Sequence, residues 1–136
     1  MRLRDLFLIN TVVALLFALG FLFMPGLIIG LLDISNDPGT HLLGRFIGAE
    51  LLVGALVTYL ARDTRDAITQ QAIILANLVA SLVGFIASLT GVLSGAMSAF
   101  GWAIVVAYFV LAFAFGYFQV NGPRKQMFAR VRRRRI

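Results

Sequence analysis

Glu50 is the residue whose type and position are best suited to chemistry, because it is a carboxylate inside a long apolar segment. That segment runs from about His41 to Leu60, so a bilayer-spanning helix would hold Glu50 near mid-membrane. An ionised carboxyl there costs about 2.5 to 3.5 kcal/mol on insertion scales, and we therefore expect a neutral carboxyl that faces protein. Two interpretations stay open: a proton or cation site, or a carboxyl that hydrogen-bonds across helices as part of the packing.

Three polar residues of later apolar segments are predicted to share the depth of Glu50. Asn77 lies near the middle of the third segment, Ser81 one turn beyond it, and Tyr108 near the middle of the fourth. We expect an intramembrane polar site in which an amide and a phenol orient the carboxyl. This expectation rests on depth alone, since hydropathy leaves the rotation of each helix open.

Arg45 is the only basic residue within a predicted span. It lies about 140° round a helix from Glu50, so the two do not form a simple pair within one helix. Its long stem can extend towards the outer end, where Asp33 and Asp37 are natural partners. The rival interpretation is an anion or headgroup site that Arg45 shares with His41, one turn away on nearly the same face.

Sequence patterns for catalysis are missing. The chain has no Gly-rich phosphate loop, no H-E-x-x-H, no Ser/His/Asp set, no cysteine and no pair of carboxylates within one span. We therefore expect a protein that is not an enzyme and that has no cofactor or metal site.

Composition indicates which elements position these residues. The 136 residues are 60% hydrophobic and 13% charged, against about 25% charged in soluble domains, and the mean hydropathy is +0.93. Pro25-Gly26 ends the first apolar run, and the piece that follows, 27–32, is too short to span. The prediction is an all-α, four-transmembrane-helix bundle with a short interfacial segment after the first helix. The domain covers residues 1–121, with spans at about 6–24, 41–60, 68–89 and 99–118, followed by a basic tail at 122–136.

The basic residues predict the orientation. Arg2 and Arg4 precede the first span and Arg62 and Arg65 follow the second, whereas the first and third loops contain no Lys or Arg. Because basic loops stay on the cytoplasmic side, both termini are predicted to be cytoplasmic, in a multi-pass protein of the cell (inner) membrane.

The tail holds seven of the twelve basic residues. Such clusters are attracted to anionic headgroups by about 1 kcal/mol per basic residue, so we expect lipid contact there, with an acidic partner subunit as the alternative. The net charge of +6 is thus explained by topology, and no nucleic acid is expected. The tail residues expected at the lipid or partner are Arg130, Arg132, Arg133, Arg134 and Arg135.

Small residues predict close helix packing. The second segment contains Gly44-x-x-x-Gly48 with Ala55 below it, and Glu50 points nearly opposite to Gly48. Both faces of this helix therefore require protein neighbours: it is central in a monomer, or one face meets a second copy or another subunit. The third segment has its own stripe of small and polar residues, namely Asn77, Ser81, Gly84, Ser88, Gly91 and Gly95.

Several stretches resemble small bacterial four-helix membrane proteins described as DoxX-like. These are Asp37-Pro-Gly through Leu-Ala-Arg-Asp63, Ser94-Gly-Ala-Met-Ser-Ala-Phe-Gly-Trp102 and Phe115-Gly-Tyr-Phe118. The resemblance implies a four-helix fold and supplies no functional site, because that group is mostly of unknown function.

The leading functional hypothesis is a non-enzymatic structural or accessory membrane subunit that packs against itself or a larger complex. The alternative is a homo-oligomeric, proton-coupled small transporter or channel built around Glu50.

Overall fold

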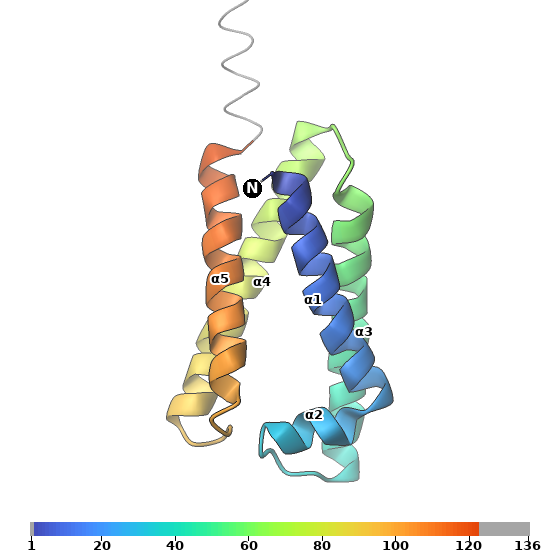
Figure 1. Ribbon diagram of the computed structural model, residues 1–136, viewed down its shortest axis with the longest axis vertical. Coiled ribbons are helices and arrows are strands. Elements are labelled where there is room, and N and C mark those ends of the chain that lie inside the picture. Colours follow the sequence, from blue (N-terminus) through green and yellow to red (C-terminus); the bar gives the residue numbers. More distant parts are fainter. Residues whose placement is uncertain (1, 123–136) are drawn as a thin grey trace, which may run out of the picture.

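Four helices long and apolar enough to cross a membrane make up most of the computed structural model, which describes residues 2–122. They are α1 (Leu3–Phe23), α3 (Pro38–Ala61), α4 (Ala67–Leu93) and α5 (Gly101–Asn121), and Figure 1 shows them as a bundle. The predicted all-α membrane fold is confirmed, and every span lies within a few residues of its predicted range. Residues 123–136, which make up all of the predicted basic tail except Gly122, lie outside the described residues.

A short helix, α2 (Pro25–Leu31), follows the break between α1 and the rest of the chain. Pro25 occupies its first turn, where a missing amide hydrogen is harmless, and Met24 closes α1 by donating its amide to Gly20 O at 2.9 Å. Figure 1 shows α2 lying across one end of the bundle. We call this end the α2 end, and the opposite end, where the chain begins, the N-terminal end.

Aspartates cap the two middle spans. Asp37 precedes α3 and accepts a hydrogen bond from the Thr40 amide at 3.0 Å, with Pro38 in the first helical turn, as the sequence predicted. Asp66 caps α4 in the same way through the Thr69 amide at 2.9 Å. These caps fix the residues at which both helices begin.

The long helices form two hairpins: α1 packs along α3, and α4 packs along α5. Contacts between the hairpins are far fewer. Figure 1 shows the hairpins close together at the N-terminal end and diverging towards the α2 end. The helices are therefore paired two by two, and no helix is surrounded by the other three.

Glycines set the contact between α1 and α3. A Cβ on Gly48 would lie 2.9 Å from Leu22 Cγ and 3.0 Å from Ala18 O, and one on Gly44 would lie 3.4 Å from Phe21 Cδ1. The predicted close packing at Gly44-x-x-x-Gly48 is confirmed, and its partner is α1. This contact fixes the rotation of α3 about its own axis.

Within the stripe of small residues on α4, Gly84 packs against α5. Ser81 and Ser88 are buried, and a Cβ on Gly84 would lie only 2.5 Å from the Tyr108 ring. The helices pack closely at Gly84, but the space there is filled by an aromatic side chain, and the second backbone that the sequence predicted does not approach it. Ser88 Oγ donates to Gly84 O at 2.7 Å, so the buried hydroxyl has a partner.

Two sets of contacts join the hairpins. Near the N-terminal end a core of buried apolar side chains draws on all four long helices, and it consists of Leu6, Phe7, Ala61, Ile74 and Phe115. At the α2 end, Ser98 donates its amide to Leu32 O at 2.8 Å and its hydroxyl to Leu31 O at 2.7 Å. The short helix therefore links the first hairpin to the connection between α4 and α5.

Candidate functional site

Glu50 lies at the centre of α3 on the face that α1 leaves uncovered. Gly44, Gly48 and Ala55 are buried towards α1, and Glu50 is exposed, about 160° round the helix from Gly48. Within the described part of the chain its carboxyl has no hydrogen-bond or ion-pair partner. A single chain therefore presents a carboxyl to its membrane-facing surface.

The predicted grouping of Glu50 with Asn77, Ser81 and Tyr108 is not formed within the chain. Asn77 hydrogen-bonds to a residue of α1, Ser81 is buried in the α4 stripe, and Tyr108 lies against Gly84. The packing of Gly48 against Ala18 and Leu22 of α1 sets the rotation of α3, and this rotation leaves Glu50 on the exposed face.

A different set of polar side chains meets inside the bundle, and we call Asn10, Thr11, Thr58 and Asn77 the polar cluster. Asn10 Nδ2 donates to Thr58 Oγ1 at 3.5 Å and to Asn77 Oδ1 at 3.3 Å. The hydroxyls of Thr11 and Thr58 lie 2.9 Å apart. The polar cluster thus connects α1, α3 and α4.

Every member of the polar cluster also bonds to the backbone or to a second member. Thr11 Oγ1 donates to Phe7 O at 2.8 Å, Thr58 Oγ1 to Gly54 O at 3.0 Å, and Asn77 Nδ2 to Ile73 O at 2.9 Å. Amides and hydroxyls with satisfied hydrogen bonds stabilise helix contacts in a membrane. The cluster contains no titratable group, so it supplies no general acid or base that could activate its threonine hydroxyls.

Asn10, Thr11 and Thr58 were missed in the sequence, although a signal was present. Asn10 and Thr11 are the only polar side chains in the predicted span 6–24. Polar residues within a span usually face protein, so this pair was sufficient to predict a contact of the first helix with another helix.

The outer charge cluster predicted from Asp33, Asp37, His41 and Arg45 is not joined by an ion pair among the described residues. Arg45 is exposed, and the ion pairs of residues 2–122 do not include one between it and Asp33 or Asp37. The cap explains this, because the Asp37 carboxylate is already bonded to groups of its own loop and helix. His41 pairs with Asn36 Oδ1 and does not join Arg45.

Hydrogen bonds lower the pKa of both capping carboxylates. For Asp37 the largest contribution is the Thr40 amide, followed by the Thr40 hydroxyl and the Ser35 hydroxyl, which lie 3.0, 2.8 and 2.8 Å away. For Asp66 the Thr69 hydroxyl comes first and the Thr69 amide second. Each set stabilises the charged form, so these aspartates act as caps and not as proton donors at neutral pH.

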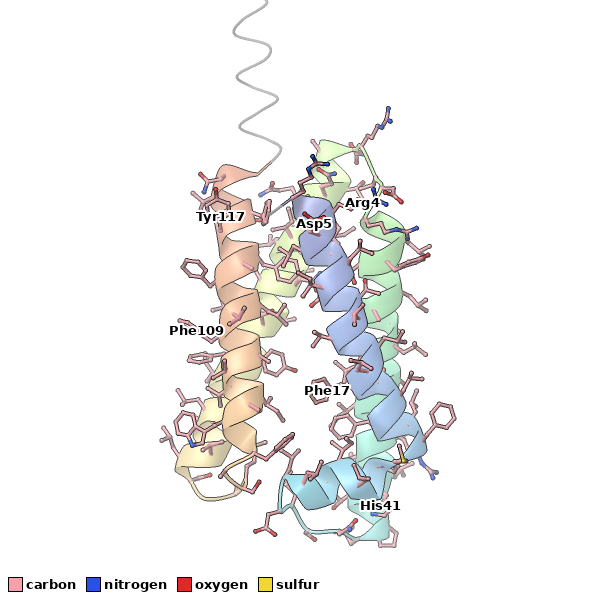
Figure 2. All side chains as sticks on the ribbon, in the orientation of Figure 1. Arg4, Asp5, Phe17, His41, Phe109 and Tyr117 are labelled. Atoms are coloured by element: carbon pink, nitrogen blue, oxygen red, sulfur yellow. The ribbon has the colours of Figure 1, made fainter. Side chains whose placement is uncertain are left out.

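Basic residues gather at the N-terminal end. Arg4 pairs with Asp63 at 3.3 Å and Arg62 pairs with the same carboxylate at 3.2 Å, and the Arg62 guanidinium lies 3.6 Å from the Tyr59 ring centroid. Figure 2 shows Arg4 at this end and His41 at the opposite end. Exposed ion pairs of this kind contribute little to stability, about 0 to 1 kcal/mol. The main consequence of these arginines is a concentration of positive charge at one end of the bundle.

Two glutamines at the N-terminal end lie between α4 and α5. Gln71 Nε2 donates to Gln119 O at 3.4 Å, and the side-chain oxygens of both residues are buried without a partner among the described residues. Neither glutamine lies in the polar cluster.

Metal-binding geometry is not found among residues 2–122, where no three side chains of His, Asp or Glu gather closely enough to hold an ion.

The comparisons with known proteins give one match, which covers nearly the whole chain. Residues 4–126 match the model of a domain of unknown function, DUF8292. The chain belongs to the DUF8292 family. No curated protein and no solved structure matches it at a significant level. The resemblance to DoxX-like proteins stays a prediction.

Proposed function

We propose that this protein is a non-enzymatic structural or accessory subunit of the cell (inner) membrane, which packs against itself or a larger membrane complex. The observation that supports this function is the position of Glu50, exposed at the centre of a helix whose opposite face is already packed against α1. A face of this kind requires a neighbour that supplies hydrogen bonds.

The surroundings of Glu50 on this face are either lipid or another protein. A carboxylate at the centre of a spanning helix costs about 2.5 to 3.5 kcal/mol on insertion scales. A hydrogen bond between helices stabilises their association by about 0.6 to 2 kcal/mol. A neutral carboxyl that forms such a hydrogen bond also has no unsatisfied donor. Contact with another protein therefore lowers the free energy of the exposed face, whereas contact with lipid does not.

The polar residues inside the bundle support a role without catalysis. The polar cluster consists of amides and hydroxyls that bond to one another and to the backbone. Such a network holds α1, α3 and α4 in register, and it contains no acid or base that could activate a threonine hydroxyl for catalysis.

The proposed orientation places both termini in the cytoplasm. Arg2, Arg4, Arg62 and Arg65 flank the ends of α1, α3 and α4 that lie together at the N-terminal end in Figure 1. Basic residues of this kind remain on the cytoplasmic side. The last turn of α5 lies at the same end, and the basic tail that follows α5 in the sequence is proposed to contact anionic headgroups.

The rival function is the proton-coupled transporter or channel. It requires a polar route that includes Glu50. Thr58, the polar-cluster residue of α3, lies about 80° round the helix from Glu50, and among the described residues no hydrogen bond joins Glu50 to the cluster. The rival therefore needs a route that is completed between copies of the chain. Reconstituted vesicles test it: a proton flux that Glu50→Gln abolishes favours this rival, and no flux under any gradient counts against it.

Purification of the untagged native complex in a gentle detergent, followed by mass measurement, tests the proposed function. We expect a particle that contains protein beyond one chain of 14.8 kDa. A monodisperse particle with a single chain, recovered also after cross-linking in the intact membrane, would refute the proposal.

A further inference from the structure

We propose that α3 pairs with α3 of a second copy across a two-fold axis along the membrane normal, so that Glu50 contacts its counterpart and the helices cross near Gly54. This inference rests on the proposed function and names the partner at its exposed face.

The exposed face of α3 contains a continuous packing pattern. Leu43, Ile47, Glu50, Gly54 and Val57 follow one another at alternating steps of four and three residues, and we call this row the Glu50 seam. Alternating steps of this kind are typical of parallel helices that pack side by side. Leu43, Ile47 and Val57 are 61%, 49% and 44% exposed, so residues 2–122 leave most of the row uncovered.

Gly54 is a glycine without a packing role inside the chain. The positions of a Cβ on Gly44 and Gly48 are filled by side chains and backbone of the first hairpin, whereas a Cβ on Gly54 would have no atom within 4 Å. Glycine weakens a helix relative to alanine, so its presence at a mid-helix position with open space calls for a reason. Close approach of a second helix is such a reason, and Gly54 lies one turn from Glu50 on the same face.

The chemistry of Glu50 favours a second copy over other partners. Copies in one membrane share one orientation, so a two-fold axis along the normal places each residue opposite itself at equal depth. A neutral carboxyl both donates and accepts a hydrogen bond, which makes two facing glutamates complementary to each other.

Arginines of a second copy are poorly placed to replace this contact. Arg45 lies about 7.5 Å along the helix axis from Glu50 and on another side of α3. The other arginines of the described chain lie near the N-terminal end. The polar group of the second copy's α3 that lies at the depth of Glu50 is therefore its own Glu50 carboxyl.

Cysteine cross-linking in native membranes tests the geometry, and the natural chain contains no cysteine to interfere. We expect rapid disulfide dimers from Ile47→Cys and from Gly54→Cys on mild oxidation. Leu56→Cys is the matched control, because Leu56 is 52% exposed at a similar depth but lies about 160° round the helix from Gly54. Equal cross-linking at all three positions, or dimers at Leu56→Cys alone, would refute the seam.

Energy transfer between labelled chains in lipid vesicles tests separately how Glu50 and Gly54 contribute to self-association. Glu50→Leu and Gly54→Leu should each weaken self-association about tenfold, while Glu50→Gln, whose amide also donates and accepts, should retain it. Gly30→Leu is the control, because a Cβ there also meets no atom within 4 Å. Helical circular dichroism of each variant confirms that the monomer is still folded.

The outcomes separate this inference from the proposed function. A native complex that holds one copy of this chain beside other proteins, without cross-links at Ile47→Cys or Gly54→Cys, overturns the inference and leaves the proposed function standing. A solitary monomer refutes both. Unchanged self-association in Glu50→Leu and Gly54→Leu overturns the inference even where dimers exist.

Discussion

The contrast between Gly48 and Gly54 gives the sharpest prediction about stability. Both are glycines of α3, six positions apart, and each is replaced by alanine. On Gly48 the added methyl would lie 2.9 Å from Leu22 Cγ and 3.0 Å from both Ala18 O and Leu22 N, whereas on Gly54 it would meet open space. The same chemical change therefore acts on a tight backbone contact in one case and on an uncovered surface in the other.

The expected difference follows from these distances. Carbon atoms pack best at about 3.5 to 4.0 Å, so Gly48→Ala forces α1 and α3 apart by several tenths of an ångström. Backbone atoms cannot rotate away, and overpacking of this kind costs about 1 to 3 kcal/mol. Both substitutions raise helix propensity by up to about 1 kcal/mol, and this gain cancels in the comparison. Gly48→Ala should thus be about 1 to 3 kcal/mol less stable than Gly54→Ala.

Reversible unfolding in mixed micelles, followed by circular dichroism, measures this difference. The experiment uses excess detergent so that the exposed face of α3 has no protein partner. Equal free energies of unfolding, or a less stable Gly54→Ala, would show that Gly48 is not the close contact between α1 and α3.

Three further predictions concern the polar cluster, a cap and the topology. Asn10→Leu should lower the free energy of unfolding by about 0.6 to 2 kcal/mol, because its amide donates to Thr58 and Asn77. Asp37→Asn should reduce the loss of stability on acidification. Hydrogen bonds lower the pKa of Asp37 in the folded state, so the contribution of its carboxylate to the free energy of unfolding is complete above about pH 4 and is lost as the pH falls further. Ser94→Cys should react with an impermeant thiol reagent from outside intact cells, and Thr64→Cys should not.

Each of these has a measurement that can contradict it. Unfolding of Asn10→Leu at the wild-type denaturant midpoint would show that the polar cluster contributes nothing. Asp37→Asn keeps a capping side chain, so melting temperatures recorded from pH 6 to pH 2 isolate the titration, and parallel curves for the two proteins would exclude Asp37 as a source of the acid effect. Labelling of Thr64→Cys and not of Ser94→Cys would reverse the proposed orientation.

Sequence alone determined the elements of this protein. Long apolar segments, separated by proline, glycine and charged turns, predicted four spans and a short piece between the first two, and the structure contains all five helices. Local rules also identified the Asp37 cap and the packing glycines Gly44 and Gly48. These features depend on residues close together in the chain, where the physics of a bilayer and of helix ends leaves few alternatives.

Tertiary structure decided which faces of the helices meet. The depth of Glu50 and Asn77 could be read from their positions along two helices, but the angle between them depends on how α3 rotates against α1. Gly48 fixes that rotation through contacts with Ala18 and Leu22, about thirty residues away in sequence. Asn77 consequently bonds to Asn10, and Glu50 stays on the exposed face. Hydropathy constrains position along the membrane normal, whereas rotation is set by side-chain packing between distant segments, and a single sequence carries no direct record of it.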